Sequence, residues 1–144
     1  IGLFYAFSFD YDNVWIQFLL FPLGVLPFTY ASSFLFQSEG IGQTVTIFLH
    51  FVMAGIGAMV VYILRIIDST FTIGDALMYT FKVVPSFSLC NTIVNSAGKG
   101  TLLIVRDNVS GDDFAMENQG SDILAIFLHL IVWSFGLLIL EGIQ

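Results

Sequence analysis

Charged residues are scarce in this chain of 144 residues, which holds four lysines and arginines and eleven aspartates and glutamates, or 10% in all. Apolar residues make up 57%, and the mean hydropathy is +0.91. A soluble domain carries about 25% charged residues and, at about 150 residues, still exposes roughly 30% of the unfolded chain's surface. So few charges cannot cover that surface. The composition therefore excludes a soluble enzyme, a disordered chain and a coiled coil, and it predicts an integral, multi-pass membrane protein.

Basic residues and cysteine are especially rare. The net charge is −7 and no basic patch exists, which excludes nucleic acid as a partner. The single cysteine, Cys90, excludes an intrachain disulfide framework and a metal cluster built on cysteines. The chain begins inside an apolar run, residues 1–9, and lacks the basic segment of a signal peptide. We interpret it as an internal fragment of a longer chain.

Long uncharged runs predict three full membrane spans, over residues 14–36, 44–64 and 123–140. At 1.5 Å per residue, each run is about as long as the roughly 30 Å hydrocarbon core is thick. Pro22 and Pro27 lie inside the first run and predict a kink. A membrane helix tolerates prolines where neighbouring groups bind the freed carbonyls. The expected fold is an all-α, polytopic membrane bundle.

The segment between the second and third spans is semi-polar and holds all four basic residues. Its apolar stretches, 73–82, 83–94 and 101–105, are individually too short to span, and Pro85 interrupts them. They predict a re-entrant or interfacial helical hairpin, with residues 95–100 as a turn. Residues 106–122 are predicted to form a polar, acidic loop.

A patch of small residues in the second span is a candidate for close helix packing. It consists of Ala54, Gly55, Gly57 and Ala58, and the four-residue spacing of its two alanines allows helices to approach closely. The general abundance of glycine and alanine in membrane helices explains the patch equally well.

Histidines lie inside two spans, His50 in the second and His129 in the third. An ionisable residue at membrane depth is a functional hypothesis by default. Neither histidine has an intramembrane carboxylate close to it in sequence. We therefore favour hydrogen bonds between helices over a proton relay. Cys90 is interpreted as a small buried apolar residue.

Local motifs predict no catalytic, cofactor or metal site. The run at 97–101, AGKGT, lacks the first glycine and the hydroxyl residue of a phosphate-binding loop. The oxygen-rich run at 107–118 has Val109 where a calcium-binding EF-hand loop needs an oxygen ligand. Asn108 begins an Asn-Val-Ser sequon and is a possible glycosylation site.

Four stretches resemble the A-subfamily of ABC transporters. Residues 22–36, PLGVLPFTYASSFLF, are similar to a kinked span of that family with the pattern P-L/F-x-Y-x-x-S-F-x-F. Residues 81–91, FKVVPSFSLCN, are similar to its F-x-I-F-P-x-F-C-L-G segment, although Cys90 is offset by two positions and the following Gly-Arg-Gly is absent. The run VVYILRII at 60–67 and the final LLILEGIQ complete the resemblance. The first pattern is carried by Pro27, Tyr30, Ser33, Phe34 and Phe36.

The resemblance implies that the chain is the latter half of a six-helix, ABC-2 type transmembrane domain, with residues 72–100 as an exocytoplasmic hairpin. Family members mostly move lipids or sterols and use ATP, with Mg²⁺, on nucleotide-binding domains that are absent from this chain. The chain alone is therefore expected not to be an enzyme. Its implied partners are membrane lipids and the remainder of the same transporter. Tyr30, Ser33, Gly55 and Gly57 would line helix contacts.

The topology has one alternative, and the function has two. The positive-inside rule assigns the basic segment to the cytoplasm, whereas the resemblance and the sequon place it outside, and we adopt the latter. An alternative function is part of an ion-coupled secondary transporter or channel with a discontinuous helix near Pro85. A third is an assembly subunit without a transport path.

Overall fold

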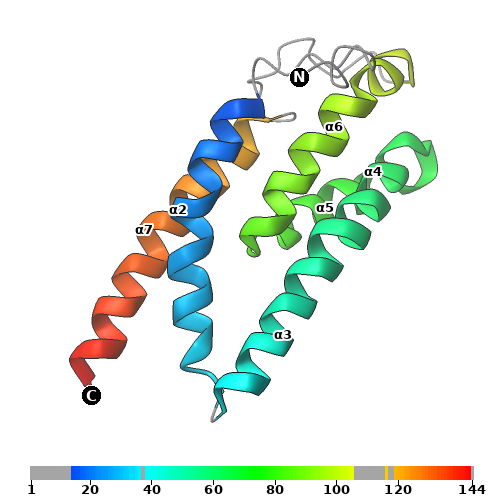
Figure 1. The fold of residues 1–144 in the computed structure, drawn as a ribbon. Helices are drawn as coiled ribbons and strands as arrows, with labels where there is room; N and C mark the ends of the chain where they lie inside the picture. Colours follow the sequence, from blue (N-terminus) through cyan, green and yellow to red (C-terminus); the bar gives the residue numbers. More distant parts are fainter. Residues whose placement is uncertain (1–13, 37, 106–115, 117–118, 144) are drawn as a thin grey trace, which may run out of the picture.

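The fold is all-α, as predicted. The computed structural model describes residues 14–36, 38–105, 116 and 119–143. The π-helical segment η1 (Val52–Gly57) links α3 to α4 without a break, and the short 3₁₀ helix η2 (Asp68–Thr70) joins α4 to α5 (Figure 1). The α-helices are α2 (Val14–Ser33), α3 (Glu39–Phe51), α4 (Ala58–Ile66), α5 (Phe71–Phe81), α6 (Pro85–Val105) and α7 (Gly120–Ile143).

Within the described residues, three helices are long and apolar enough to cross a membrane: Val14–Ser33, Gly40–Ile66 and Gly120–Ile139. Most of their side chains are not buried inside the protein, as expected for helices whose outer faces contact acyl chains. The chain is therefore an integral, multi-pass membrane protein. α2 runs through both prolines and ends three residues before the predicted span does, and α3 begins five residues before the second uncharged run.

α5 and α6 form the predicted re-entrant hairpin. In Figure 1, α2 and α7 lie side by side and run in the same direction, while α3, η1 and α4 run the opposite way. α5 turns back from η2 into the bundle, the chain reverses between Phe81 and Pro85, and α6 returns toward the side that holds η2. We call this the η2 side. Proline suits the first position of α6, where its missing N–H costs no helical hydrogen bond.

Residues 95–100 lie inside α6, although the sequence predicts a turn there. The glycine at position 98 instead allows α4 and α6 to approach closely. The Tyr62 hydroxyl donates a hydrogen bond of 3.1 Å to the Gly98 carbonyl. A Cβ atom at position 98 would lie 2.0 Å from that hydroxyl. The glycine thus leaves room for the Tyr62 ring and does not mark a change in chain direction.

The predicted acidic loop over 106–122 ends earlier than expected. Most of this segment, including Asn108, lies outside the described residues. Gly120 begins α7, so Ser121 and Asp122 lie in its first turn, and both are buried. The free N–H groups at a helix N-terminus favour a negative charge there. Asp122 therefore belongs to the protein interior and not to a solvated loop.

An apolar core holds the hairpin against α4. The Phe81 and Phe87 rings meet edge to face with centroids 5.5 Å apart. Met53, Leu77, Cys90 and Val94 are half-buried and pack around the cluster, so Cys90 is less buried than the sequence predicts. Its fully buried members are Ala58, Val61, Met78 and Phe87.

A second packed pair is formed by α2 and α7. A Cβ atom on Gly24 would lie 3.1 Å from the Ile126 carbonyl oxygen, so the two backbones come close at this point. Farther along, Phe28 meets Trp133 edge to face at a centroid distance of 5.1 Å. These contacts join the first and third spans.

Candidate functional site

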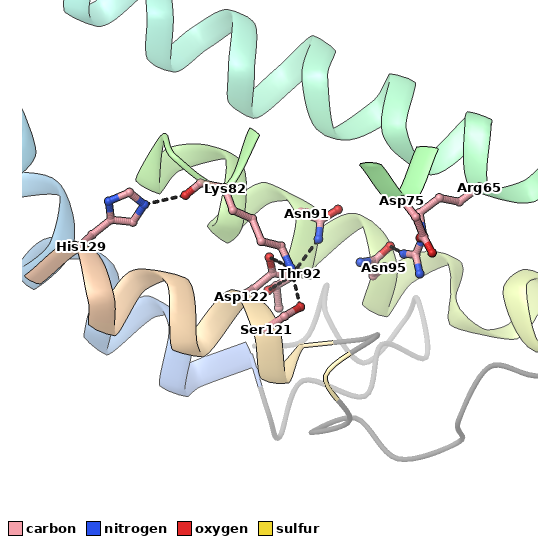
Figure 2. A network of polar contacts seen from close by, with 9 residues as sticks. All are labelled: Arg65, Asp75, Lys82, Asn91, Thr92, Asn95, Ser121, Asp122 and His129. Atoms are coloured by element: carbon pink, nitrogen blue, oxygen red, sulfur yellow. Dashed lines mark hydrogen bonds and ion pairs between the residues drawn. The ribbon is translucent and has the colours of Figure 1, made fainter. Parts of the chain in front are cut away.

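A buried ion pair lies where the tip of the hairpin meets α7 (Figure 2). Lys82 follows α5 and is 7% exposed, and Asp122 is completely buried. The Lys82 Nζ atom lies 3.1 Å from Asp122 Oδ1 and donates a hydrogen bond to Ser121 Oγ. Burial lowers the pKa of Lys82 from its ordinary value, and the charge of Asp122 opposes that shift. The pair therefore neutralises two charges in the protein interior.

The second oxygen of the Asp122 carboxylate is bound by α6. Asn91 Nδ2 donates to Asp122 Oδ2 at 2.8 Å, and Thr92 Oγ1 donates to the same oxygen at 3.2 Å. Hydrogen bonds to the ionised form favour a charged carboxylate in a buried position. α5, α6 and α7 thus meet at this single side chain.

His129 binds the backbone of the same lysine. It lies seven residues after Asp122, two turns along one face of α7. Trp133 Nε1 donates to His129 Nδ1 at 2.9 Å, so that nitrogen carries a lone pair. The proton is therefore on Nε2, which lies 2.6 Å from the Lys82 carbonyl oxygen and donates to it (Figure 2). α7 holds both the ammonium and the carbonyl group of Lys82.

His50 joins α3 to the other flank of the hairpin tip. Its Nδ1 atom lies 2.8 Å from Ser86 Oγ. Phe28 lies against both histidines, with ring centroids 5.5 Å from His50 and 6.4 Å from His129. The prediction that the two histidines make hydrogen bonds between helices is confirmed.

A second ion pair lies nearer the η2 side. Arg65, which is 2% exposed, places its Nε atom 2.9 Å from Asp75 Oδ1. Its Nη1 atom donates to Asn95 Oδ1 at 3.4 Å. Gly74 makes room for the arginine, because a Cβ atom there would lie 2.9 Å from Arg65 Cγ. This pair ties α4 to both helices of the hairpin.

Several buried polar atoms have no hydrogen-bond partner among the described residues. Such a group costs about 1–3 kcal/mol when it stays unpaired, and native proteins contain few. Most lie on α6 or near the starts of α2 and α7. They are both amide atoms of Gln17, Ser88 Oγ, Asn91 Oδ1, Asn95 Nδ2, Gln119 Oε1 and His50 Nε2.

The small residues of the second span divide between two environments. Gly57 and Ala58 are buried, and a Cβ atom on Gly57 would lie 3.6 Å from the rings of Phe81 and Phe87. Ala54 is half-buried. Gly55 is exposed, with nothing within 4 Å of a Cβ atom built on it.

The other two packing candidates lie on the outer face of α2. Tyr30 and Ser33 are exposed, and Ser33 Oγ donates to the Tyr30 carbonyl at 2.7 Å. The structure does not bring them to the small-residue patch.

Sequence reasoning did not single out Lys82 and Asp122. In the sequence, these two residues are visible only as a lysine and an aspartate beside apolar stretches. Nothing there indicates that they pair.

Among the residues that the structure describes, no group of three or more histidine, cysteine, aspartate or glutamate side chains could hold a metal ion. No family model, curated protein or solved structure matches this chain.

Replacing His129 with leucine is expected to destabilise the protein by about 1–3 kcal/mol, since it removes the partner of both the Lys82 carbonyl and the Trp133 indole. Glutamine offers a donor and an acceptor and should recover part of the loss. Denaturant titrations of both variants in mixed micelles test this. The ¹⁵N shifts of the His129 ring should report a neutral Nε2–H tautomer, and a protonated Nδ1 at neutral pH would contradict the assignment.

Proposed function

We propose that this chain is part of the transmembrane domain of an ATP-driven ABC transporter that moves lipid or sterol across or out of the membrane. ATP and Mg²⁺ would be bound by nucleotide-binding domains outside this chain. The contribution of the chain is mechanical, since its helices would shift relative to one another when those domains close. Its partners are membrane lipids and the other helices and domains of the same transporter.

The α5–α6 hairpin carries this proposal. The resemblance to A-subfamily ABC transporters implies a hairpin over 72–100, between two spans and dipping back into the bilayer. α5 and α6 cover 71–105, lie between the second and third spans and return to the side from which they enter (Figure 1). A re-entrant segment is tolerated only where protein or water surrounds its backbone. Simple anchor helices have no need of such an element.

The buried Lys82–Asp122 pair favours a second candidate, part of an ion-coupled transporter or channel. Ionisable residues at membrane depth often mark ion or proton paths. In secondary transporters, broken helices present their ends to the substrate, and the hairpin breaks just before Pro85. Here, however, the chain reverses direction at the break. α5 and α6 are therefore not two halves of one spanning helix, and this favours the first proposal.

The test is lipid movement by the complete protein in sealed liposomes. Dithionite quenching of a fluorescent phospholipid or sterol measures how fast the lipid changes leaflets. ATP with Mg²⁺ is expected to accelerate the movement, and a non-hydrolysable ATP analogue is not. Deletion of residues 14–64 should abolish it. ATP-driven movement that survives this deletion would contradict the proposal. Lipid movement that requires an imposed ion gradient, at a rate that ATP does not change, would support the second candidate instead.

A further inference from the structure

The described helices form two bodies that are each held together internally. The α2–α7 body is joined where Gly24 approaches Ile126 and where Phe28 packs on Trp133. The hairpin body consists of α4, α5 and α6 and is joined by the apolar core around Phe87 and by the ion pair between α4 and α5.

The ion pair and several hydrogen bonds between the two bodies join the hairpin to α7, and α6 also lies against α2. The hairpin reaches α7 through the Lys82–Asp122 pair, through Asn91 and Thr92, and through the hydrogen bond from His129 (Figure 2). Ser88 lies one turn before Thr92 on the same face of α6. We call this junction the polar seam. It comprises Lys82, Ser88, Asn91, Thr92, Ser121, Asp122 and His129.

The apolar face of α6 packs against α4 and α5 and not against α7. Phe87, Cys90 and Val94 recur at spacings of three and four residues, so they share one face of the helix, and that face packs into the core with α4 and α5. Separating these apolar surfaces in water would be unfavourable. Polar groups, in contrast, exchange their partners for water at little net cost. The seam is therefore the interface along which the two bodies separate most readily.

Some atoms in the seam would gain from separation. Ser88 Oγ and Asn91 Oδ1 have essentially no accessible surface and no hydrogen-bond partner among the described residues. No water can reach them in this arrangement. Opening the seam would hydrate both atoms, which favours an open state over an interface that stays permanently closed.

The opposite end of the bundle provides a hinge. Only a few residues separate α2 from α3 there, and the hydroxyl oxygens of Ser32 and Thr46 lie 3.3 Å apart. The two bodies thus stay connected near the α2–α3 turn, and a separation would widen toward the η2 side.

We propose that the α2–α7 body and the hairpin body come apart along the polar seam during the working cycle, which opens the hairpin tip to water from the η2 side. The structure is the closed state, in which Lys82 and Asp122 neutralise each other. In the open state, water replaces each partner. This inference deepens the proposed function, because a transporter needs states of different access, yet it does not depend on the molecule moved or on the energy source.

The test is the accessibility of position 88 to a water-soluble reagent. Ser88→Cys in a Cys90→Ser background exchanges one small side chain for another, at a hydroxyl with no partner among the described residues. The complete protein in nanodiscs is treated with a membrane-impermeant, cationic methanethiosulfonate, and modification is followed by mass spectrometry. We expect slow modification of this variant. Adding Asp122→Asn, which removes the charge that holds Lys82, should accelerate it about tenfold, because reaction requires a hydrated thiolate.

Native Cys90 in the otherwise unchanged protein is the matched control. It lies two residues from Ser88 and is half-buried, and its packed side lies against the apolar core and not in the polar seam. It should stay unmodified with and without Asp122→Asn. No reaction at position 88 in either background, or equal reaction at 88 and 90, would overturn the inference. Failed lipid movement with the expected labelling would count against the proposed function alone.

Discussion

Replacing Asp122 with alanine is expected to lower the free energy of unfolding by about 3–5 kcal/mol, the largest single effect that we foresee. The substitution leaves Lys82 as a buried charge without its counter-ion. It also removes the acceptor of the hydrogen bonds from Asn91 and Thr92. Denaturation of the protein in mixed micelles, followed by tryptophan fluorescence, measures the loss.

A double-mutant cycle separates the pair from its surroundings. Lys82→Met removes one charge, and Asp122→Asn removes the other while it keeps an acceptor for Asn91 and Thr92. Each single variant leaves one uncompensated buried charge. The double variant leaves none and should cost clearly less than the sum of the two, because a buried pair that is replaced as a whole is often close to neutral. Strict additivity would show that the two side chains are not coupled.

Replacing Gly74 with alanine is expected to cost about 1–3 kcal/mol through overpacking, although alanine is intrinsically the better helix former. The new Cβ atom would lie 3.0 Å from the backbone nitrogen of Arg65 and 3.1 Å from the carbonyl carbon of Leu64. Backbone atoms cannot move aside as a flexible side chain can. α5 would have to shift away from α4, which would also weaken the Arg65–Asp75 pair.

Gly55→Ala is the matched control, since this glycine is also helical but has nothing within 4 Å of a built Cβ atom. Here the higher helix propensity of alanine acts alone, so the variant should be neutral or up to about 1 kcal/mol more stable. Thermal unfolding of both variants in the same micelles makes the comparison. Equal losses at the two positions would contradict the packing described at Gly74.

The three spans could be predicted from the sequence because a membrane helix is specified locally. A continuous run without formal charge reports directly that its segment can lie in hydrocarbon. The ends were less well predicted, because a helix can continue into the polar interface, as α3 does from Glu39. The helical course of residues 95–100 was also missed. There Gly98 leaves room for the ring of Tyr62, which lies far away in the chain.

The candidate site could not be predicted in the same way. Lys82 and Asp122 lie far apart in the sequence, and nothing in the residues near either one indicates the other. Asp122 even follows an acidic stretch, so its sequence context favours a solvated loop. Burial reverses that interpretation, because a carboxylate inside the protein must be paired with a cation or hydrogen-bond donors.

By itself, the sequence determined that this protein is helical and membrane-embedded, with three spans and a re-entrant hairpin, because these follow from the length and polarity of continuous segments. Only the tertiary structure decided which face of α6 meets which neighbour. That choice places the apolar face against α4 and the polar face against α7. The scarce charges therefore do not simply coat the ends of the helices. Lys82 and Asp122 are buried as a pair, and Arg65 is buried beside a half-exposed Asp75, because a charge persists inside the protein only beside its partner.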